Sequence, residues 1–390
     1  MRVIHVITRL IIGGAQENTV ATVLGLQNQA GLQIDLISGP TCGPEGSLEP
    51  SFPAEPKLLT ILPSLVRPVH PARDWQAFRQ LRGIFEHARP RIVHTHSGKA
   101  GVLGRLAAHQ AGVPIIIHTI HGPSFGLFQG AAANWLFRAA ERQAGQATTH
   151  FISVSDAMTR QYLAAGIGRP EQYTRIFSGF DLNPFLAARN DAELRRQWGI
   201  ASEEFVVGKI ARLVRLKGHD DLLAAAPLVL QGNPRTKFLL LGDGILRSQL
   251  ESKARAQGLA DKIIFVGMVP PGELPKYVGI MDAVVHLSRR EGLPRALPQA
   301  LAACRPIVAY DCDGANEVCF PGRTGFLIQP GESAALAERL VELAGDAKLR
   351  ERLGQNGRDF VRRHFAVETM VAEIASLYRR LASISRDHER

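Results

Sequence analysis

The sequence predicts an α/β protein made of two Rossmann-like, doubly wound parallel sheets that face a central cleft. Short runs of β-branched and apolar residues alternate with longer amphipathic segments along both halves of the chain. This alternation stops near Asn183-Pro184 and then starts again, which indicates two domains. With 390 residues, of which 45% are hydrophobic, the chain is long enough to bury two cores.

The first half is predicted to begin with a strand and a helix separated by a glycine pair, and then to repeat that order. Residues 39–72 are rich in Pro and Gly, which predicts a long loop with a short strand near residues 58–62. The other strands are predicted at residues 2–7, 34–38, 91–95, 114–119 and 151–154, and the helices at residues 15–29, 75–86, 99–110 and 131–145.

The second half repeats the pattern. Strands are predicted at residues 205–211, 237–241, 263–266, 283–287 and 306–309, and helices at residues 218–230, 245–257, 274–280 and 296–303, before a mainly helical tail from residue 334 onward. Ligands of such sheets bind at the carboxyl ends of the strands, so the chemistry is expected there, in the cleft.

The net charge of +10 favours phosphate-bearing ligands in general. Nucleic acid is disfavoured, because the arginines are scattered and few aromatic residues lie among them. The four cysteines form no CxxC pair, which indicates a reduced, cytoplasmic protein without a zinc site. Thr8-Arg9 interrupts the apolar start before a secretory signal can form, and no apolar run approaches the roughly 20 residues of a membrane helix. A peripheral membrane contact remains compatible with this composition.

Two features at strand ends are typical of anion binding. Gly13-Gly14 follows the first strand and opens a helix, so the backbone can approach a ligand there, although a simple turn explains the pair equally well. It is not a GxGxxG fingerprint. Arg212 and Lys217 follow the first strand of the second half, where two cations can hold a diphosphate. The alternative is a pair of solvated surface charges.

Polar residues at other strand ends have weaker interpretations. His94, His96, His118 and His121 follow two strands and suggest a polar cleft floor, and the position of His121 favours a functional role. A metal site at these histidines lacks a carboxylate or cysteine at suitable spacing. Asp311-Cys312-Asp313 resembles a metal-binding DxD, but a turn before Gly314 is favoured. The residues from Trp135 to Arg138 have the spacing of a core helix, which is favoured over a membrane-facing stripe.

The order and spacing of these segments resemble glycosyltransferase family 4, whose members are retaining enzymes of the GT-B fold. The resemblance runs through nearly the whole chain. It is carried by residues 13–16, 94–101, 118–122, 152–155 and 178–181, the Arg212 and Lys217-Gly218 pair, residues 241–244, and the long block at 288–325.

The resemblance implies roles for individual residues. Arg212 and Lys217 would bind the donor diphosphate, Gly14 would let the backbone approach it, and Glu291 would contact hydroxyls of the transferred sugar. His121 would lie near the reacting sugar and the acceptor. The implied catalytic residues are His121, Arg212, Lys217 and Glu291, and the implied donor-binding residues are Gly13, Gly14, Arg212, Lys217, Gly267, Glu291, Leu293, Pro294, Arg295 and Gln299.

Three positions depart from the family pattern. Gln299 replaces the second acidic residue of the E-x7-E motif, and an amide holds a ribose diol more weakly than a carboxylate does. Pro294 stands where glycine is frequent and removes one backbone N–H. Cys304 replaces a common glycine. The first Glu, both cations and the histidine are kept, so activity is expected.

The resemblance implies an acceptor-side domain at residues 1–183, a nucleotide-sugar donor domain at 184–365, and a final helix at about 366–390 that packs back on the first domain. The expected reaction moves a hexosyl unit, with retention and without a metal or other cofactor, from a nucleotide-diphosphate sugar to a saccharide or lipid-linked saccharide. Such an enzyme would serve cell-surface polysaccharide or glycolipid synthesis in the cytoplasm or at the inner face of the membrane. The alternatives are a non-hydrolysing sugar-nucleotide epimerase and a non-catalytic sugar-nucleotide binder.

Overall fold

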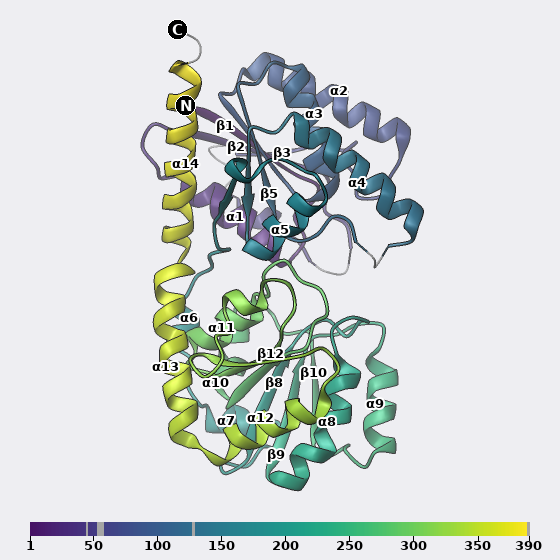
Figure 1. Cartoon of the computed structure of the whole chain (residues 1–390), viewed down its shortest axis with the longest axis vertical. Helices are drawn as coiled ribbons and strands as arrows, with labels where there is room; N and C mark the ends of the chain where they lie inside the picture. The colour runs from purple at the N-terminus through teal and green to yellow at the C-terminus, as the bar shows by residue number, and fades with distance from the viewer. Residues whose placement is uncertain (44–45, 53–57, 127–128, 388–390) are drawn as a thin grey trace. The chain divides into compact units, whose positions relative to one another are not determined.

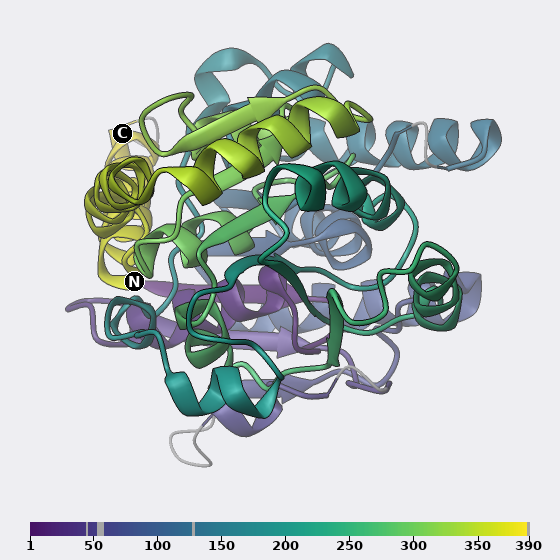
Figure 2. The same cartoon turned by 90° about the horizontal axis from the view of Figure 1, so that it is seen from below.

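The computed structural model describes residues 1–43, 46–52, 58–126 and 129–387. The chain divides into two compact units, the first formed by Met1–Phe180 together with Ala366–Arg390 and the second by Asp181–Phe365. Figure 1 and the perpendicular view in Figure 2 show strands covered by helices in both units. The Asn183-Pro184 pair lies just inside the second unit, where it opens the short helix α6 (Asn183–Leu186).

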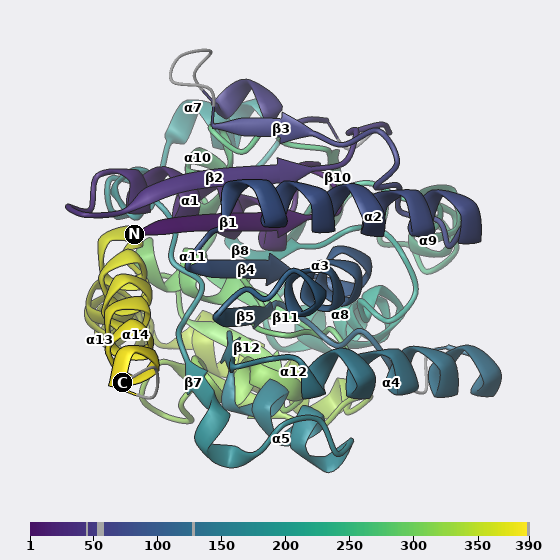
Figure 3. The ribbon, with the colours of Figure 1, turned by 90° about the horizontal axis from the view of Figure 1, so that it is seen from above.

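The first unit contains a seven-stranded parallel sheet with the strand order β3-β2-β1-β4-β5-β6-β7. Figure 3 shows β3, β2, β1, β4 and β5 in that order. The strands are β1 (Arg2–Ile7), β2 (Gln33–Ser38), β3 (Leu59–Ile61), β4 (Ile92–His96), β5 (Ile115–Ile120), β6 (His150–Ser153) and β7 (Tyr173–Arg175). The helices are α1 (Gly14–Gln27), α2 (Pro71–Ala88), α3 (Gly98–Gln110), α4 (Ala131–Gln146), α5 (Asp156–Ala164) and α14 (Val367–Asp387), with 3-10 turns at Glu49–Ser51 and Pro170–Gln172.

Helices cover both faces of this sheet, because successive side chains of a strand point to opposite sides. Val3 and Ile92 belong to a core that includes residues of α1 and α14. Ile4 and Val93 belong to a separate core that includes residues of α2 and α3. The last helix of the chain is therefore an integral part of the first unit.

The second unit contains a six-stranded parallel sheet with the order β10-β9-β8-β11-β12-β13. Its strands are β8 (Phe205–Ile210), β9 (Thr236–Leu241), β10 (Ile263–Gly267), β11 (Ala283–His286), β12 (Ile307–Tyr310) and β13 (Gly325–Ile328). Its other elements are α7 (Ala192–Gln197), α8 (His219–Gly232), α9 (Arg247–Ala256), α10 (Leu274–Gly279), α11 (Ala296–Ala302), α12 (Ser333–Gly345), α13 (Ala347–His364) and the 3-10 turn η3 (Asp313–Glu317).

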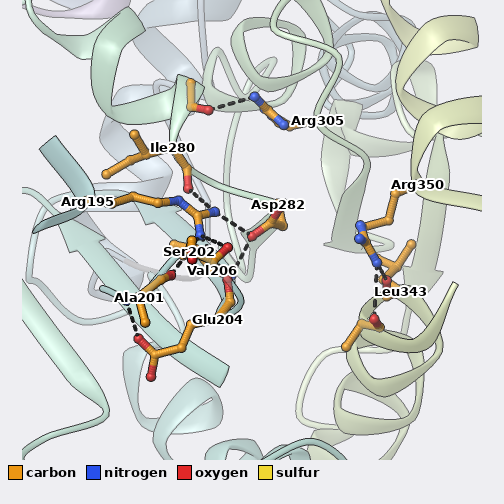
Figure 4. A network of polar contacts seen from close by, with 12 residues as sticks. Arg195, Ala201, Ser202, Glu204, Val206, Ile280, Asp282, Arg305, Leu343 and Arg350 are labelled. Atoms are coloured by element: carbon orange, nitrogen blue, oxygen red, sulfur yellow. Dashed lines mark hydrogen bonds and ion pairs between the residues drawn. The ribbon is translucent and has the colours of Figure 1, made fainter. Parts of the chain in front are cut away.

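A buried arginine fixes the amino ends of the two central strands of this unit (Figure 4). Arg195 of α7 is 4% exposed, and its guanidinium donates to Asp282 Oδ2 at 2.9 Å and to the carbonyl of Ile280 at 3.0 Å. Asp282, just before β11, also accepts from the backbone N–H of Val206 in β8 at 2.8 Å. Arg195 thus ties α7 to both strands at the end opposite to the one where ligands bind.

Both sheets have the strands and helices that the sequence predicts, with differences at the edges. The short strands β7 and β13 were not predicted, nor were the helices α5, α6 and α7, because such short elements lack a long apolar run. Helix α2 begins at Pro71 rather than at residue 75, because Pro71 suits the first turn and His70 Nδ1 accepts the N–H of Arg73 at 3.3 Å.

The residues from Trp135 to Arg138 of α4 were predicted to lie in the core, and this prediction is wrong for Trp135 and Leu136. Trp135 is 71% exposed and Leu136 54% exposed, whereas Phe137 packs against a small core beneath the helix. None of the helices in the described ranges is long and apolar enough to cross a membrane.

Candidate active site

The second unit has a candidate binding site where its strand order reverses. Strands β8 and β11 are neighbours, but the chain proceeds from β8 toward β9 on one side and from β11 toward β12 on the other. Adjacent loops separate at such a switch point and leave a crevice at the carboxyl ends of the strands. The two loops here are residues 211–218 after β8 and residues 287–295 after β11.

An ion pair connects these two loops. The ammonium of Lys217 contacts the Glu291 carboxylate, and both side chains are mostly buried, with 19% and 24% of their surfaces exposed. Burial by itself raises the pKa of Glu291, but the nearby His286 ring and the Lys217 ammonium outweigh that effect and lower the pKa to about 2. Glu291 is therefore an anion at neutral pH, as a carboxylate that accepts hydrogen bonds from sugar hydroxyls should be.

His286 and Asp313 surround Glu291 from two other elements. His286 Nε2, at the end of β11, lies 3.6 Å from Glu291 Oε1, which is too long for a hydrogen bond. Burial lowers the pKa of His286, so at neutral pH Lys217 supplies the positive charge at the carboxylate, and a protonated His286 ring adds to it only at the acidic pH where Glu291 titrates. Asp313 Oδ2 accepts the backbone N–H of Glu291 at 2.6 Å and so holds the loop.

Asp313 opens η3 with a φ of 49°, and Asp311 accepts a hydrogen bond from Asn316 at 3.2 Å. Asp311 thus makes a local contact, and Asp313 holds the loop that carries Glu291. These contacts agree with the turn interpretation of Asp311-Cys312-Asp313.

Arg212 lies in the same loop as Lys217, but it is exposed. Its carbonyl accepts a hydrogen bond from His219 Nε2 at 2.9 Å, and the next residue, Leu213, is fully buried. On the other side, the N–H of Ala211 donates to the Leu241 carbonyl at 3.0 Å, so the backbone is anchored before and after the Arg212 side chain. Within the described ranges the Arg212 guanidinium has no hydrogen-bond or ion-pair partner, so its donors are available to an anion.

The remaining residues predicted to bind the donor lie around the same strand ends. Leu293 and Pro294 are buried in the loop after β11. Arg295, which precedes α11, and Gln299, which lies within it, are partly exposed. The donor contacts of these four residues remain predictions. Gly267 ends β10 with a φ of 89°, and a Cβ there would meet the Arg247 guanidinium at 3.1 Å. Its carbonyl accepts the N–H of Gly242 at 2.8 Å.

Sequence reasoning missed two residues around Glu291. They are His286 and Lys209, a lysine inside β8 that is only 2% exposed. Sequence reasoning considered Asp313 only as part of a DxD or a turn and did not foresee its contact with the Glu291 loop. Burial, followed by the charge of Lys217, lowers the pKa of Lys209 to about 7. A lysine in the middle of an apolar strand was the available signal, since a buried ammonium needs compensating groups nearby.

The first unit contains a cavity of about 690 Å³ at its own switch point, between β1 and β4. Thr8 follows β1, Ser97 follows β4 and His121 follows β5, and all three line the cavity. Lys99 on its wall pairs with Asp74 of α2. Gly13 and Gly14 begin α1 beside Ala15 and Gln16, which also line the cavity.

The histidines predicted to form one cleft floor separate to the two faces of the sheet. His118 faces α3, where a Cβ on Gly101 would meet its ring at 2.5 Å. His94 and His96 face the other way and join His5 of β1, which sequence reasoning missed. One ring nitrogen from each of these three lies within 4.8 Å of the others, as in a metal site, but the rings already make hydrogen bonds, His5 with His96 and His94 with Tyr378. Only His118 and His121 line the cavity.

Two family models together match most of the chain. The model described as glycosyl transferases group 1 matches residues 190–360, and the model described as glycosyl transferase 4-like domain matches residues 13–178. The first match contains the Lys217 and Glu291 loops, and the second contains most of the residues that line the cavity of the first unit.

Individual relatives agree with these models. EpsD of Bacillus subtilis, which carries a provisional glycosyltransferase name, is 30% identical over 311 residues that cover 77% of this chain and 79% of EpsD. An Escherichia coli UDP-Gal:alpha-D-GlcNAc-diphosphoundecaprenol alpha-1,3-galactosyltransferase is 27% identical over 321 residues, which cover 81% of this chain and 82% of that enzyme. The crystal structure of Anabaena HepE in complex with UDP and glucose has a TM-score of 0.80 and 22% identity, covering 97% of this chain and 99% of HepE.

Proposed function

The chain belongs to the glycosyltransferases and has the GT-B fold, and from that premise we propose that it transfers a hexosyl unit, with retention, from a nucleotide-diphosphate sugar to a saccharide or lipid-linked saccharide. The observation that carries the donor side of this proposal is the Lys217–Glu291 pair at the switch point of the second sheet. One site there combines a cation for phosphate with a carboxylate for sugar hydroxyls.

In this mechanism Lys217 and Arg212 bind the diphosphate and offset the negative charge that grows on it as the sugar leaves. Glu291 orients the sugar by accepting hydrogen bonds from its hydroxyls, and Gln299 contacts the ribose. The acceptor hydroxyl attacks from the face that the diphosphate leaves, and the departing diphosphate takes its proton. The two cations do the work that a metal does in other transferases, so we propose a metal-independent reaction.

We assign the acceptor to the first unit, where His121 and Lys99 line the cavity at the switch point. The relatives support an acceptor of this class: the Escherichia coli enzyme is named for a diphosphoundecaprenol-linked acceptor, and CapM of Staphylococcus aureus, 24% identical, for capsular polysaccharide biosynthesis. By this reasoning the reaction serves cell-surface polysaccharide or glycolipid synthesis, with the enzyme in the cytoplasm or at the inner face of the membrane.

A peripheral membrane contact fits the rim of the cavity. Val69 and Leu136 line the cavity and are 66% and 54% exposed, and Trp135, beside Leu136, is 71% exposed. Arg67, also on the wall, is exposed and would face anionic headgroups. Flotation with vesicles that contain anionic lipid tests this: we expect the wild type to float and a Trp135→Ala, Leu136→Ala variant to float less. Equal flotation of both would contradict the contact.

The function itself is tested by incubating the protein with UDP-, GDP- and ADP-sugars and measuring released nucleotide with and without saccharide and lipid-linked saccharide acceptors. We expect acceptor-dependent release from one donor class, unchanged by EDTA, and a product whose anomeric configuration by NMR matches that of the donor. Conversion of the sugar nucleotide to its epimer without acceptor would identify an epimerase. Binding without transfer or hydrolysis would identify a non-catalytic binder.

A further inference from the structure

A row of hydrogen-bonded side chains runs inside the first unit from β5 through α14 to the cavity. The groups come from four elements that are far apart in sequence, and Tyr378 of α14 lies in the middle. The successive contacts are Thr119 Oγ1 to His94 Nε2 at 2.6 Å, His94 Nδ1 to Tyr378 Oη at 2.5 Å, Tyr378 Oη to His5 Nε2 at 3.2 Å, His5 Nδ1 to His96 Nε2 at 2.9 Å, and His96 Nδ1 to His121 Nε2 at 3.1 Å.

The interior of this row is dry and uncharged. His5, His94 and Tyr378 are completely buried and His96 is 1% exposed, so water cannot replace a missing partner. Burial lowers the pKa of His5 and of His121 to about 3, and lowers the pKa of His94 and His96 well below the ordinary value. All four rings are therefore neutral at physiological pH, and each carries one proton on one of its two nitrogens.

Neutral rings in a row must all point their protons in the same direction. Each imidazole donates from one nitrogen and accepts at the other, and the Tyr378 hydroxyl has a single proton. If one ring reversed, one contact would have two protons facing each other and another would have two lone pairs. Only two arrangements satisfy every contact: all protons directed toward His121, or all directed away from it.

Thr119 selects between these two arrangements. Thr119 is 4% exposed, and among the described residues His94 Nε2 is the one hydrogen-bond partner of its hydroxyl. The Thr119 proton is satisfied only when it is donated to His94. His94 then donates from Nδ1 to Tyr378, Tyr378 donates to His5, and the same direction continues through His96 to His121.

We propose that Tyr378 is a positioning residue that, through His5 and His96, holds His121 in the Nδ1–H tautomer. His121 Nε2 accepts from His96, so Nδ1 is the nitrogen left for a ligand in the cavity that His121 lines. His121 is thereby a fixed hydrogen-bond donor to that ligand, and its lone pair is not available as a general base. The ligand group that it recognises is an acceptor oxygen, such as a hydroxyl or phosphate oxygen.

The tautomer is tested without any substrate. In protein labelled with ¹⁵N-histidine, NMR spectra that correlate ring nitrogens with ring protons identify the tautomer, and His121→Gln assigns the His121 signals. We expect a single Nδ1–H tautomer for His121 in the wild type and a mixture in Tyr378→Phe. The matched control is Tyr173→Phe, which removes a hydroxyl that donates to the Ile167 carbonyl at 2.8 Å in the same unit and should leave the His121 signals unchanged.

A second variant tests the proposal independently, in case the Tyr378→Phe protein does not fold. Thr119→Val removes the proton that sets the direction, keeps the side-chain shape, and should also give a mixture of tautomers. An Nε2–H tautomer in the wild type, or no change in either variant, would overturn the proposal. A stoichiometric metal ion in the purified protein would also overturn it, because a ligated nitrogen cannot take part in the row.

The consequence for turnover rests on the proposed function, and a double-mutant cycle measures it. We expect Tyr378→Phe to lower kcat by about two-fold to ten-fold, with the KM of the donor unchanged, because only part of the population keeps the competent tautomer. In the His121→Gln background the same change should have no further effect. Equal losses in both backgrounds would mean that Tyr378 is only structural. If the NMR result holds but no transfer occurs, the proposed function fails while the tautomer assignment stands.

Discussion

Lys217 and Glu291 are 74 positions apart in the sequence, yet their charged groups are paired within the second unit. Lys217 follows β8 and Glu291 follows β11, and these strands are hydrogen-bonded neighbours. Because parallel strands place their carboxyl ends at the same edge of a sheet, the two loops meet there. The pair is mostly buried, so removing either partner leaves the other charge without compensation.

Replacing Lys217 by Ala should abolish turnover. The variant loses the cation that offsets charge on the departing diphosphate, and we expect kcat/KM to fall by about 100-fold or more, as when a single charge-stabilising donor is removed from an active site. Released nucleotide measures the effect. Arg215→Ala is the matched control, since Arg215 is an exposed cation of the same loop. Full activity of the Lys217 variant would exclude this site.

Asp313 should matter as the hydrogen-bond acceptor for the Glu291 loop and not as a metal ligand. Asp313→Gly removes the acceptor without straining the positive φ, and we expect kcat/KM to fall about ten-fold, which corresponds to one lost hydrogen bond to a charged group. Asp313→Asn keeps an acceptor oxygen and should stay within about three-fold of the wild type. Donor kinetics measure both. A large loss in the Asn variant, together with inhibition by EDTA, would favour metal binding.

Gln299→Glu should tighten donor binding. A carboxylate accepts hydrogen bonds from a ribose diol more strongly than an amide, so we expect the KM of the donor to fall by about two-fold to ten-fold with kcat unchanged. Gln257→Glu adds the same charge at an exposed position after α9 and controls for the change in net charge. If KM moves equally in both variants, Gln299 does not contact the ribose.

Lys209 should make the second unit more stable as the pH rises. Burial lowers the pKa of Lys209 from an ordinary 10.5 to about 7, so between these values the unfolded chain binds more protons than the folded chain. Stability therefore rises with pH across this window, and the contribution is lost as the pH falls toward 7. The full difference is on the order of 3–5 kcal/mol.

Urea unfolding at pH 7 and pH 9.5 measures this dependence. Lys209→Met carries no ammonium, so its midpoint should exceed that of the wild type at pH 7, and the advantage should shrink at pH 9.5. Lys237→Met is the control, because Lys237 on the neighbouring strand β9 donates to the Asp261 carbonyl at 2.6 Å near the surface. A difference in urea midpoint between the wild type and Lys209→Met that does not change with pH would contradict the prediction.

The main strands and helices could be predicted because their signals are local. The run from Arg2 to Ile7 is largely apolar and β-branched, and Val20 and Val23 in the segment after Gly13-Gly14 have helical spacing, so both elements are visible within one short window. The short strand β13 could not be predicted in this way, since its four residues are held by pairing with β12. Trp135 has the spacing of a core residue, but among the described residues of its unit no other element covers it.

The sequence by itself determined two doubly wound sheets, two cations after the first strand of the second half, and the family resemblance, because strand periodicity and motif spacing are properties of neighbouring residues. Only the tertiary structure decided which distant groups meet. Tyr378 lies 373 positions from His5 and hydrogen-bonds to it because α14 packs on the face of the sheet that carries His5. Asp313 and Lys217 meet the loop of Glu291 because β12 and β8 are the two neighbours of β11 in the second sheet. Such contacts are set by strand order and helix docking, which no local pattern encodes.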